Sequence, residues 1–252
     1  LSPIMWTVPP KDEYYYHHIK ALFLNSDILL TNSSLESHKL SDAFDIDIDK
    51  FHKTRNSIAD VFRTTKTDSD FREQFSIKGD FVLTVANIDT RKNTHNLIKA
   101  CVESGLQLVS VGHIRDIPYY ESFKDRYSNF RHIGNISDVD LLKSAYQQCQ
   151  VFALPSICET PGIAALEAAS QGARIVITDE GAAPEYFKDM VTYVDPSDLD
   201  DIAKGLDTEL KLERDNSLRQ YIIDNYTWDK TAMDIIAGYR KIFSDDMVDF
   251  ES

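Results

Sequence analysis

From Asp80 onward, short apolar runs alternate with helical patterns six times along the chain. Each run is apolar throughout instead of alternating with polar residues, which is typical of parallel strands buried on both faces. We therefore predict an open, doubly wound parallel α/β sheet covered by helices on both sides. The expected strands are 81–86, 106–111, 130–133, 151–154, 174–178 and 191–194, and the expected helices are 94–104, 119–127, 137–148, 161–171, 183–187, 199–208, 217–225 and 229–243.

The first 80 residues contain too few strands to complete a sheet of their own. We expect an extended segment at 1–10, helices at 12–25 and 34–44, strands at 27–33 and 50–58, and a short helix ending at Phe75. A polar stretch and the turn at Lys78 and Gly79 separate this part from the regular pattern. The predicted organisation is a small unit at 1–58, a linker at 59–79, a main domain at 80–226, and a terminal helix with an acidic tail at 227–252.

Charge and cysteine content restrict the class of partner. Asp and Glu number 41 and Lys and Arg 27, which gives a net charge of −14 over 252 residues and argues against nucleic acid as the partner. No apolar run approaches the ~20 residues of a membrane span, so any membrane contact is expected through other regions. Three cysteines without CxxC spacing indicate reduced thiols. We expect a cytoplasmic protein, either free or held peripherally at the inner face of the membrane.

Ligands bind doubly wound sheets at the carboxyl ends of their strands, so the polar loops there are the candidate site. The first loop, NIDTRKN, carries Arg91 and Lys92, and adjacent cations at a strand end suit a diphosphate. An exposed basic pair on a surface loop is the alternative. Gly112, followed by His113, and Gly134 come after the next two strands, where glycine lets a nucleotide approach the backbone or simply makes a turn.

The stretch 154–172, LPSICETPGIAALEAASQG, places Glu159 in a loop and Glu167 eight residues later inside a helix. Thr160 is the expected cap, Pro161 the first helical residue, and Gly162 a point of close approach. A helix N-terminus attracts phosphate. Glu167 falls on a face that should be buried, where a carboxylate needs hydrogen-bond partners such as ligand hydroxyls. Because glutamate pairs at this spacing are common on helices, the two acids could equally be structural.

Together these motifs resemble the carboxyl-terminal half of glycosyltransferase family 4, enzymes of the GT-B fold. The resemblance runs from Phe81 to about Phe243 and includes VANIDTRKN, FRHIGNISDVDLLKSAYQQCQVFALPS, the E-x7-E stretch CETPGIAALEAASQG, and YTWDKTAMDIIAGYRKIF. It implies a Rossmann-like, nucleotide-sugar-binding domain at 80–226. It also implies that 1–58 is the tail of an amino-terminal acceptor domain, most of which lies outside this sequence.

The resemblance implies retaining transfer of a sugar from a nucleotide diphosphate to a glycan or lipid-linked acceptor, without a metal or other cofactor. Lys92, with Arg91, would hold the donor phosphates, Glu159 the sugar hydroxyls and Glu167 the ribose. The remaining donor contacts would come from backbone or side-chain groups of Asn87, Gly112, His113, Gly134, Gly162 and Ile163. The RKN loop favours GDP-mannose slightly as the donor.

The sequence departs from the family pattern at two positions. Many members carry Arg where Asn87 stands, and Pro161 lacks the N–H that would otherwise face a phosphate. These changes leave open a second hypothesis, a non-catalytic GT-B-like subunit that binds and supports a partner glycosyltransferase. A sugar-nucleotide epimerase of similar fold is a third hypothesis, which would require catalytic residues from other regions.

Overall fold

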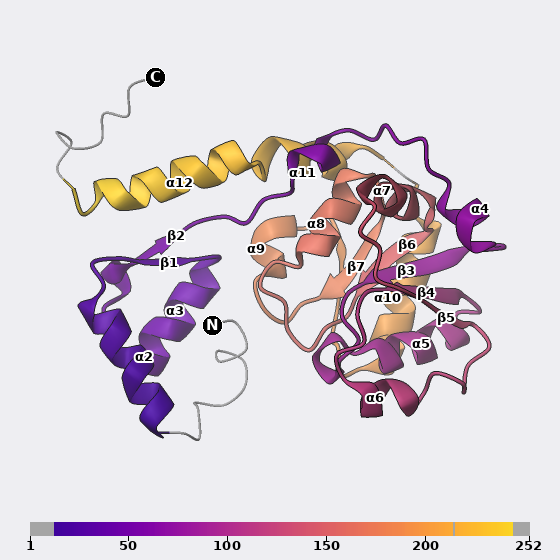
Figure 1. Ribbon diagram of the computed structural model, residues 1–252, viewed down its shortest axis with the longest axis horizontal. Coiled ribbons are helices and arrows are strands. Elements are labelled where there is room, and N and C mark those ends of the chain that lie inside the picture. The colour runs from indigo at the N-terminus through magenta and orange to yellow at the C-terminus, as the bar shows by residue number, and fades with distance from the viewer. Residues whose placement is uncertain (1–12, 214, 244–252) are drawn as a thin grey trace. The chain divides into compact units, whose positions relative to one another are not determined.

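The computed structural model describes residues 13–213 and 215–243, so the predicted extended segment at 1–10 and the acidic tail lie outside the described residues. The chain forms two compact units (Figure 1). Of the described residues, 13–57 and 226–243 form one unit, and 58–213 and 215–225 form the other. The polar segment 59–79 thus belongs to the second unit, and the terminal helix belongs to the first.

The second unit contains a six-stranded parallel sheet, which confirms the predicted fold class. Its order is β5-β4-β3-β6-β7-β8. The chain starts at β3 in the middle, moves outward through β4 to β5, and then returns to the other side of β3 at β6. The order therefore reverses between β3 and β6. The strands are β3 Phe81–Val85, β4 Gln107–Val111, β5 Phe130–Gly134, β6 Val151–Leu154, β7 Ile175–Thr178 and β8 Thr192–Val194.

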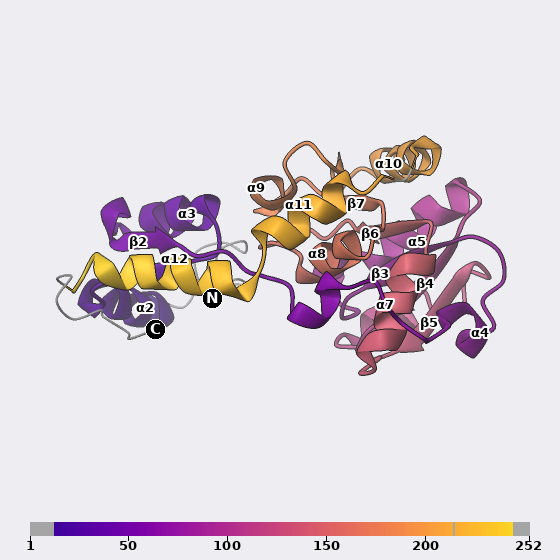
Figure 2. The same cartoon turned by 90° about the horizontal axis from the view of Figure 1, so that it is seen from above.

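Helices cover both faces of this sheet. On one side α10 packs against α5 and against β6, β7 and β8, and on the other α8 packs against β6, β7, α7 and α11 (Figure 2). The residues of β6 and β7 are almost completely buried between these layers, whereas every residue of β5, at one edge of the sheet, is half-buried. The helices are α4 Phe71–Phe75, α5 Thr94–Glu103, α6 Ile117–Glu121, α7 Val139–Gln148, α8 Ile163–Ser170, α9 Ala183–Phe187, α10 Leu199–Lys211 and α11 Ser217–Asn225.

The starts of α7 and α8 differ from the sequence prediction. The helix expected at 161 begins at Ile163, because Gly162 takes a left-handed conformation with φ 76° and Thr160 does not cap it. Asp138, not Ser137, caps α7, since its carboxylate accepts from the backbone N–H groups of Asp140 and Leu141. In both cases several neighbouring residues could cap the helix, and the sequence prediction chose Thr160 over Gly162 and Ser137 over Asp138.

The first unit is a parallel two-stranded sheet with helices. It contains α2 Glu13–Asn25, β1 Leu29–Thr31, α3 Ser34–Phe44, the 3-10 turn η1 Ile48–Lys50, β2 Phe51–Lys53 and α12 Trp228–Arg240. The strand predicted at 50–58 ends at Lys53, because the Arg55 backbone N–H donates to the Asp234 carboxylate on α12 (3.1 Å) instead of to a neighbouring strand. Gly238 lets α12 close on the sheet, since a Cβ there would lie 2.8 Å from the His52 ring.

Candidate functional site

The loops that follow β3 and β6 meet at the carboxyl edge of the sheet, because these strands are neighbours where the order reverses. In doubly wound sheets this switch point is where ligands bind. The Ile157 N–H donates to the Arg91 carbonyl (2.8 Å), which joins the two loops directly. Two of the loops that the sequence analysis singled out therefore lie side by side.

Lys92 and Glu159 form an ion pair across these two loops. Their side chains are 13% and 7% exposed, so the pair is largely shielded from water, which strengthens the attraction between the charges. The Asp89 carboxylate accepts from the Lys92 N–H (3.0 Å) and fixes the turn that carries the lysine. Arg91 is exposed instead, and its Nη1 donates to the Cys158 carbonyl at 3.4 Å. The predicted cation pair thus divides into one shielded and one exposed cation.

Asn93 clamps the loops together, and the sequence analysis did not find it. The residue is buried, in a left-handed conformation with φ 57° that asparagine tolerates better than most residues. Its Nδ2 donates to the Pro155 carbonyl (3.0 Å) and to the Pro196 carbonyl (2.7 Å). An asparagine immediately before a helix was the available signal for this role.

The loop after β7 holds Glu159 from the other side. The Glu159 N–H donates to the Glu180 carbonyl (3.0 Å), and the Glu159 carbonyl accepts from the Ala182 N–H (2.8 Å). Between these contacts Gly181 has φ 110°, and a Cβ there would lie 2.1 Å from the Glu159 carbonyl oxygen. The close contact in this loop is therefore an approach of two backbones.

The start of α8 lies next to this ion pair in the sequence. The first N–H groups of a helix have no intrahelical acceptor, and here they belong to Ile163 and its neighbour Ala164. The Gly162 carbonyl already accepts from Ala165 and Leu166 (2.8 and 3.1 Å). Because Pro161 is buried and has no N–H, anion binding at this end would depend on Gly162 and Ile163.

Glu167 meets a partner that the sequence analysis did not identify. The hydroxyl of Tyr146 on α7 donates to Glu167 Oε2 at 3.0 Å. Burial raises the pKa of Glu167 to about 7, although the bond from Tyr146 acts in the opposite direction. Burial also raises the pKa of Tyr146 well above its usual range, so the tyrosine is the donor. The second glutamate of the E-x7-E stretch thus changes charge near neutral pH.

The other predicted contacts lie along the same edge of the sheet, on the β3, β4 and β5 loops. The His113 carbonyl accepts from Ile88 N–H (2.8 Å), and the Gly134 carbonyl accepts from Gly112 N–H (2.9 Å). Gly112 has φ 143°, and a Cβ there would lie 2.0 Å from the Ala86 carbonyl oxygen. The neighbouring backbone therefore leaves room only for glycine at this position. Gly134 (φ 88°) faces open space, and Asn87 is half-buried at the end of β3.

Two hollows lie away from these loops, at the opposite ends of the strands. One, of 480 Å³, is lined by residues that include Arg174, Thr192 and Glu209, and another, of 580 Å³, includes Gly105 and Asn129. All three cysteines, which lie within the described ranges, are buried thiols that form no disulfide. Within the described ranges, three or more His, Cys, Asp or Glu side chains do not gather as a metal site would require. No described helix is both long enough and apolar enough to cross a membrane.

An open parallel sheet with charged loops at its switch point is the arrangement of a Rossmann-like α/β domain, which binds its ligand at the carboxyl ends of the strands. Residues 65–227 match the family described as glycosyl transferases group 1. Because this match covers more than half of the chain, the chain belongs to that family.

Curated relatives support the assignment. An uncharacterized glycosyltransferase, MJ1607, from Methanocaldococcus jannaschii is 29% identical over 68% of this chain and 47% of its own length. The serotype-specific mannosyltransferase WbdA from Escherichia coli is 22% identical over 92% of this chain and 31% of its own length. The chain therefore spans less than half the length of these relatives.

Solved structures share the fold at lower identity. A glycosyltransferase from Rickettsia africae has a TM-score of 0.77 at 16% identity and covers 93% of this chain and 68% of its own. Anabaena Alr3699/HepE, solved with UDP and glucose, has a TM-score of 0.73 at 15% identity and covers 94% of this chain and 68% of its own.

Proposed function

We propose that this chain carries the donor-binding part of a retaining glycosyltransferase that takes a nucleotide-diphosphate sugar. The observation that carries the proposal is the shielded Lys92–Glu159 pair at the switch point, close in sequence to the start of α8. A cation and free helix N–H groups are what a diphosphate requires. A carboxylate held beside the cation suits the hydroxyls of the attached sugar.

The charge of the leaving group determines the roles we assign. When the bond between the sugar and the nucleoside diphosphate breaks, negative charge develops on the diphosphate. Lys92, the exposed Arg91 and the N–H groups of Gly162 and Ile163 would stabilise that charge without a metal. Glu159 would bind sugar hydroxyls and Glu167 the ribose, while the edge formed by Asn87, Gly112, His113 and Gly134 would receive the base.

The donor that we favour is GDP-mannose, transferred to a glycan or lipid-linked acceptor. The RKN loop and the mannosyltransferase among the relatives support mannose, whereas the UDP complex of Anabaena HepE supports uridine as the competing base. We expect the protein to act in the cytoplasm, with any membrane contact peripheral. A titration with GDP, UDP, GDP-mannose and UDP-glucose by calorimetry distinguishes the two bases.

The central experiment compares Lys92→Ala with Lys99→Ala, a matched change on α5. We expect the wild type and Lys99→Ala to bind the preferred nucleoside diphosphate equally, and Lys92→Ala to bind at least roughly tenfold more weakly, because a phosphate contact of a charged group is lost. Equal affinity in all three proteins would contradict the proposal. Binding without sugar transfer in a chain extended to the length of its relatives would favour the non-catalytic subunit.

A further inference from the structure

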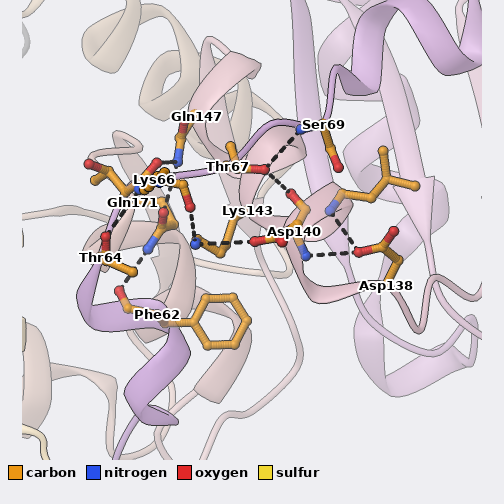
Figure 3. A network of polar contacts seen from close by, with 12 residues as sticks. Phe62, Thr64, Lys66, Thr67, Ser69, Asp138, Asp140, Lys143, Gln147 and Gln171 are labelled. Atoms are coloured by element: carbon orange, nitrogen blue, oxygen red, sulfur yellow. Dashed lines mark hydrogen bonds and ion pairs between the residues drawn. The ribbon is translucent and has the colours of Figure 1, made fainter.

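The segment at 58–67, which begins the second unit, runs along α7. A series of hydrogen bonds holds it there, several of which Figure 3 shows. Lys143, buried on α7, donates to the Lys66 carbonyl, and the Thr67 hydroxyl donates to the Asp140 carbonyl (2.9 Å). The side chain of Gln147 donates to the Thr65 carbonyl (2.8 Å). Residues spaced three to four positions apart along α7 thus fix this segment through two side chains and one backbone carbonyl.

The same segment also reaches the surroundings of Glu167. Phe62, in the 3-10 turn η2 Asp60–Arg63, packs its ring edge to face with Tyr146, with centroids 6.2 Å apart. Gln171, one turn after Glu167, donates to the Phe62 carbonyl (2.7 Å). On its other side Tyr146 contacts the ring of Phe152, with centroids 5.7 Å apart. Tyr146 is fully buried, so these contacts determine where its hydroxyl points.

We propose that Tyr146 is a positioning residue for the nucleotide site: held by Phe62, its hydroxyl fixes the carboxylate of Glu167 in the orientation that accepts the ligand's hydroxyls. The inference rests on the proposed role of Glu167 toward ribose. One carboxylate oxygen accepts from Tyr146, which leaves the other for the ligand. The segment at 58–67 thereby becomes part of the nucleotide site without touching the nucleotide.

The charged groups around Glu167 are few, so a titration can report on this contact. Of the elements packed against α8, β6 and β7 carry no ionisable side chains. In η2, Asp60 and Arg63 pair with each other (3.7 Å). Burial raises the pKa of Glu167, and the hydrogen bond from Tyr146 partly opposes this rise. The remaining ionisable groups on the packed helices are Asp140 and Lys143 on α7 and Arg219, Tyr221 and Asp224 on α11.

The test measures GDP and UDP affinity by calorimetry between pH 5.5 and 8.5 for the wild type, Glu167→Gln, Tyr146→Phe and Phe62→Leu. Glu167→Gln supplies the baseline, because the terminal phosphate of the ligand itself titrates near pH 6. Relative to that baseline, wild-type affinity should rise as the pH passes about 7, where Glu167 ionises. Tyr146→Phe keeps the ring and removes the hydroxyl that lowers the pKa of Glu167.

We expect Tyr146→Phe to move this rise to higher pH and to weaken binding roughly tenfold at pH 7, as the loss of a hydrogen bond to a charged group does. Phe62→Leu should move the rise in the same direction by less. Tyr127→Phe is the matched control: it removes a hydroxyl bonded to His95, and it should follow the wild type.

Two different failures can be told apart. If Glu167→Gln weakens binding but Tyr146→Phe keeps the wild-type profile, the positioning role is wrong and the ribose role stands. If Glu167→Gln binds nucleotide as the wild type does at every pH, the ribose role fails and the positioning role fails with it. A Tyr146→Phe profile that drops equally at all pH values indicates general structural damage and also overturns the inference.

Discussion

Lys92 and Glu159 lie 67 residues apart in the sequence and form an ion pair where the strand order of the sheet reverses. Each side chain is mostly buried, so each depends on the other for its charge to be tolerated. The fold therefore holds a cation and a carboxylate next to each other at the candidate site. This dependence leads to the first prediction.

Removing both members of this pair should cost less than the sum of removing each one alone. Lys92→Met or Glu159→Gln alone leaves one shielded charge or polar group without its partner, which costs about 3 kcal/mol, while the double variant leaves neither. We expect the double variant to fall short of the summed single effects by about 2 kcal/mol. Hydrogen exchange of the β3 and β6 amides measures this within the second unit. Additive effects would show that the two side chains do not interact.

The carboxylate of Glu167 should make the second unit less stable as pH rises. Its folded pKa is raised from 4.5 to about 7, so its protonated form is favoured in the folded state, and stability is highest below about 4.5 and is lost as the pH rises through about 7. The expected loss from this group is on the order of 3 kcal/mol. Urea unfolding of Glu167→Gln should lack this slope.

Glu103→Gln, at an exposed glutamate of α5, is the control and should keep the wild-type slope. A Glu167→Gln protein whose stability falls with pH as steeply as the wild type would contradict the assignment. If the substitution stabilises the protein at pH 8 while weakening nucleotide binding, Glu167 is retained at a cost in stability, as functional sites often are.

Gly181 should be required for the shape of the Glu159 loop. A Cβ at Gly181 would collide with the Glu159 carbonyl at 2.1 Å, whereas Gly172, also at positive φ, has open space around it. Gly172→Ala therefore meets only backbone strain, about 1–2 kcal/mol. We expect Gly181→Ala to lose several times more stability and to abolish nucleotide binding, as calorimetry and thermal unfolding would show. Equal losses in the two variants would mean that the backbone contact is unimportant.

The sequence predicted the loops of this site better than its internal contacts. Apolar strands separated by helices specify a doubly wound sheet, and this is sufficient to place Lys92 and Glu159 at the same edge. Tyr146 and Asn93 were missed because their roles depend on which side of α7 faces α8 and on which carbonyls the folded loops present. Gly162 was treated as a helical residue, since Thr160 and Pro161 provided a more familiar start signal. Close approaches of two backbones, as at Gly112 and Gly181, leave no periodic pattern.

The last prediction concerns the first unit, where Arg55 and Asp234 attach α12 to the end of β2. Arg55 Nε and Nη2 donate to the two carboxylate oxygens of Asp234 at 2.6 and 2.9 Å. Burial raises the pKa of Asp234, but the bonds from Arg55 outweigh it and the pKa lies below its usual value. The stabilisation is therefore present above the unfolded pKa of about 3.9 and is lost as the pH falls through the lower folded value.

Asp234→Asn should accordingly destabilise the first unit by about 2 kcal/mol at pH 7, and by much less at a pH below the lowered folded pKa, where the wild-type carboxylate is itself protonated. The fluorescence of Trp228 on α12, in a Trp6→Phe background, follows urea unfolding of this unit. Asp42→Asn, at an exposed position on α3, should remain within about 0.5 kcal/mol of the background protein. An Asp234→Asn protein with the same deficit at both pH values would place its effect in packing and not in the ion pair.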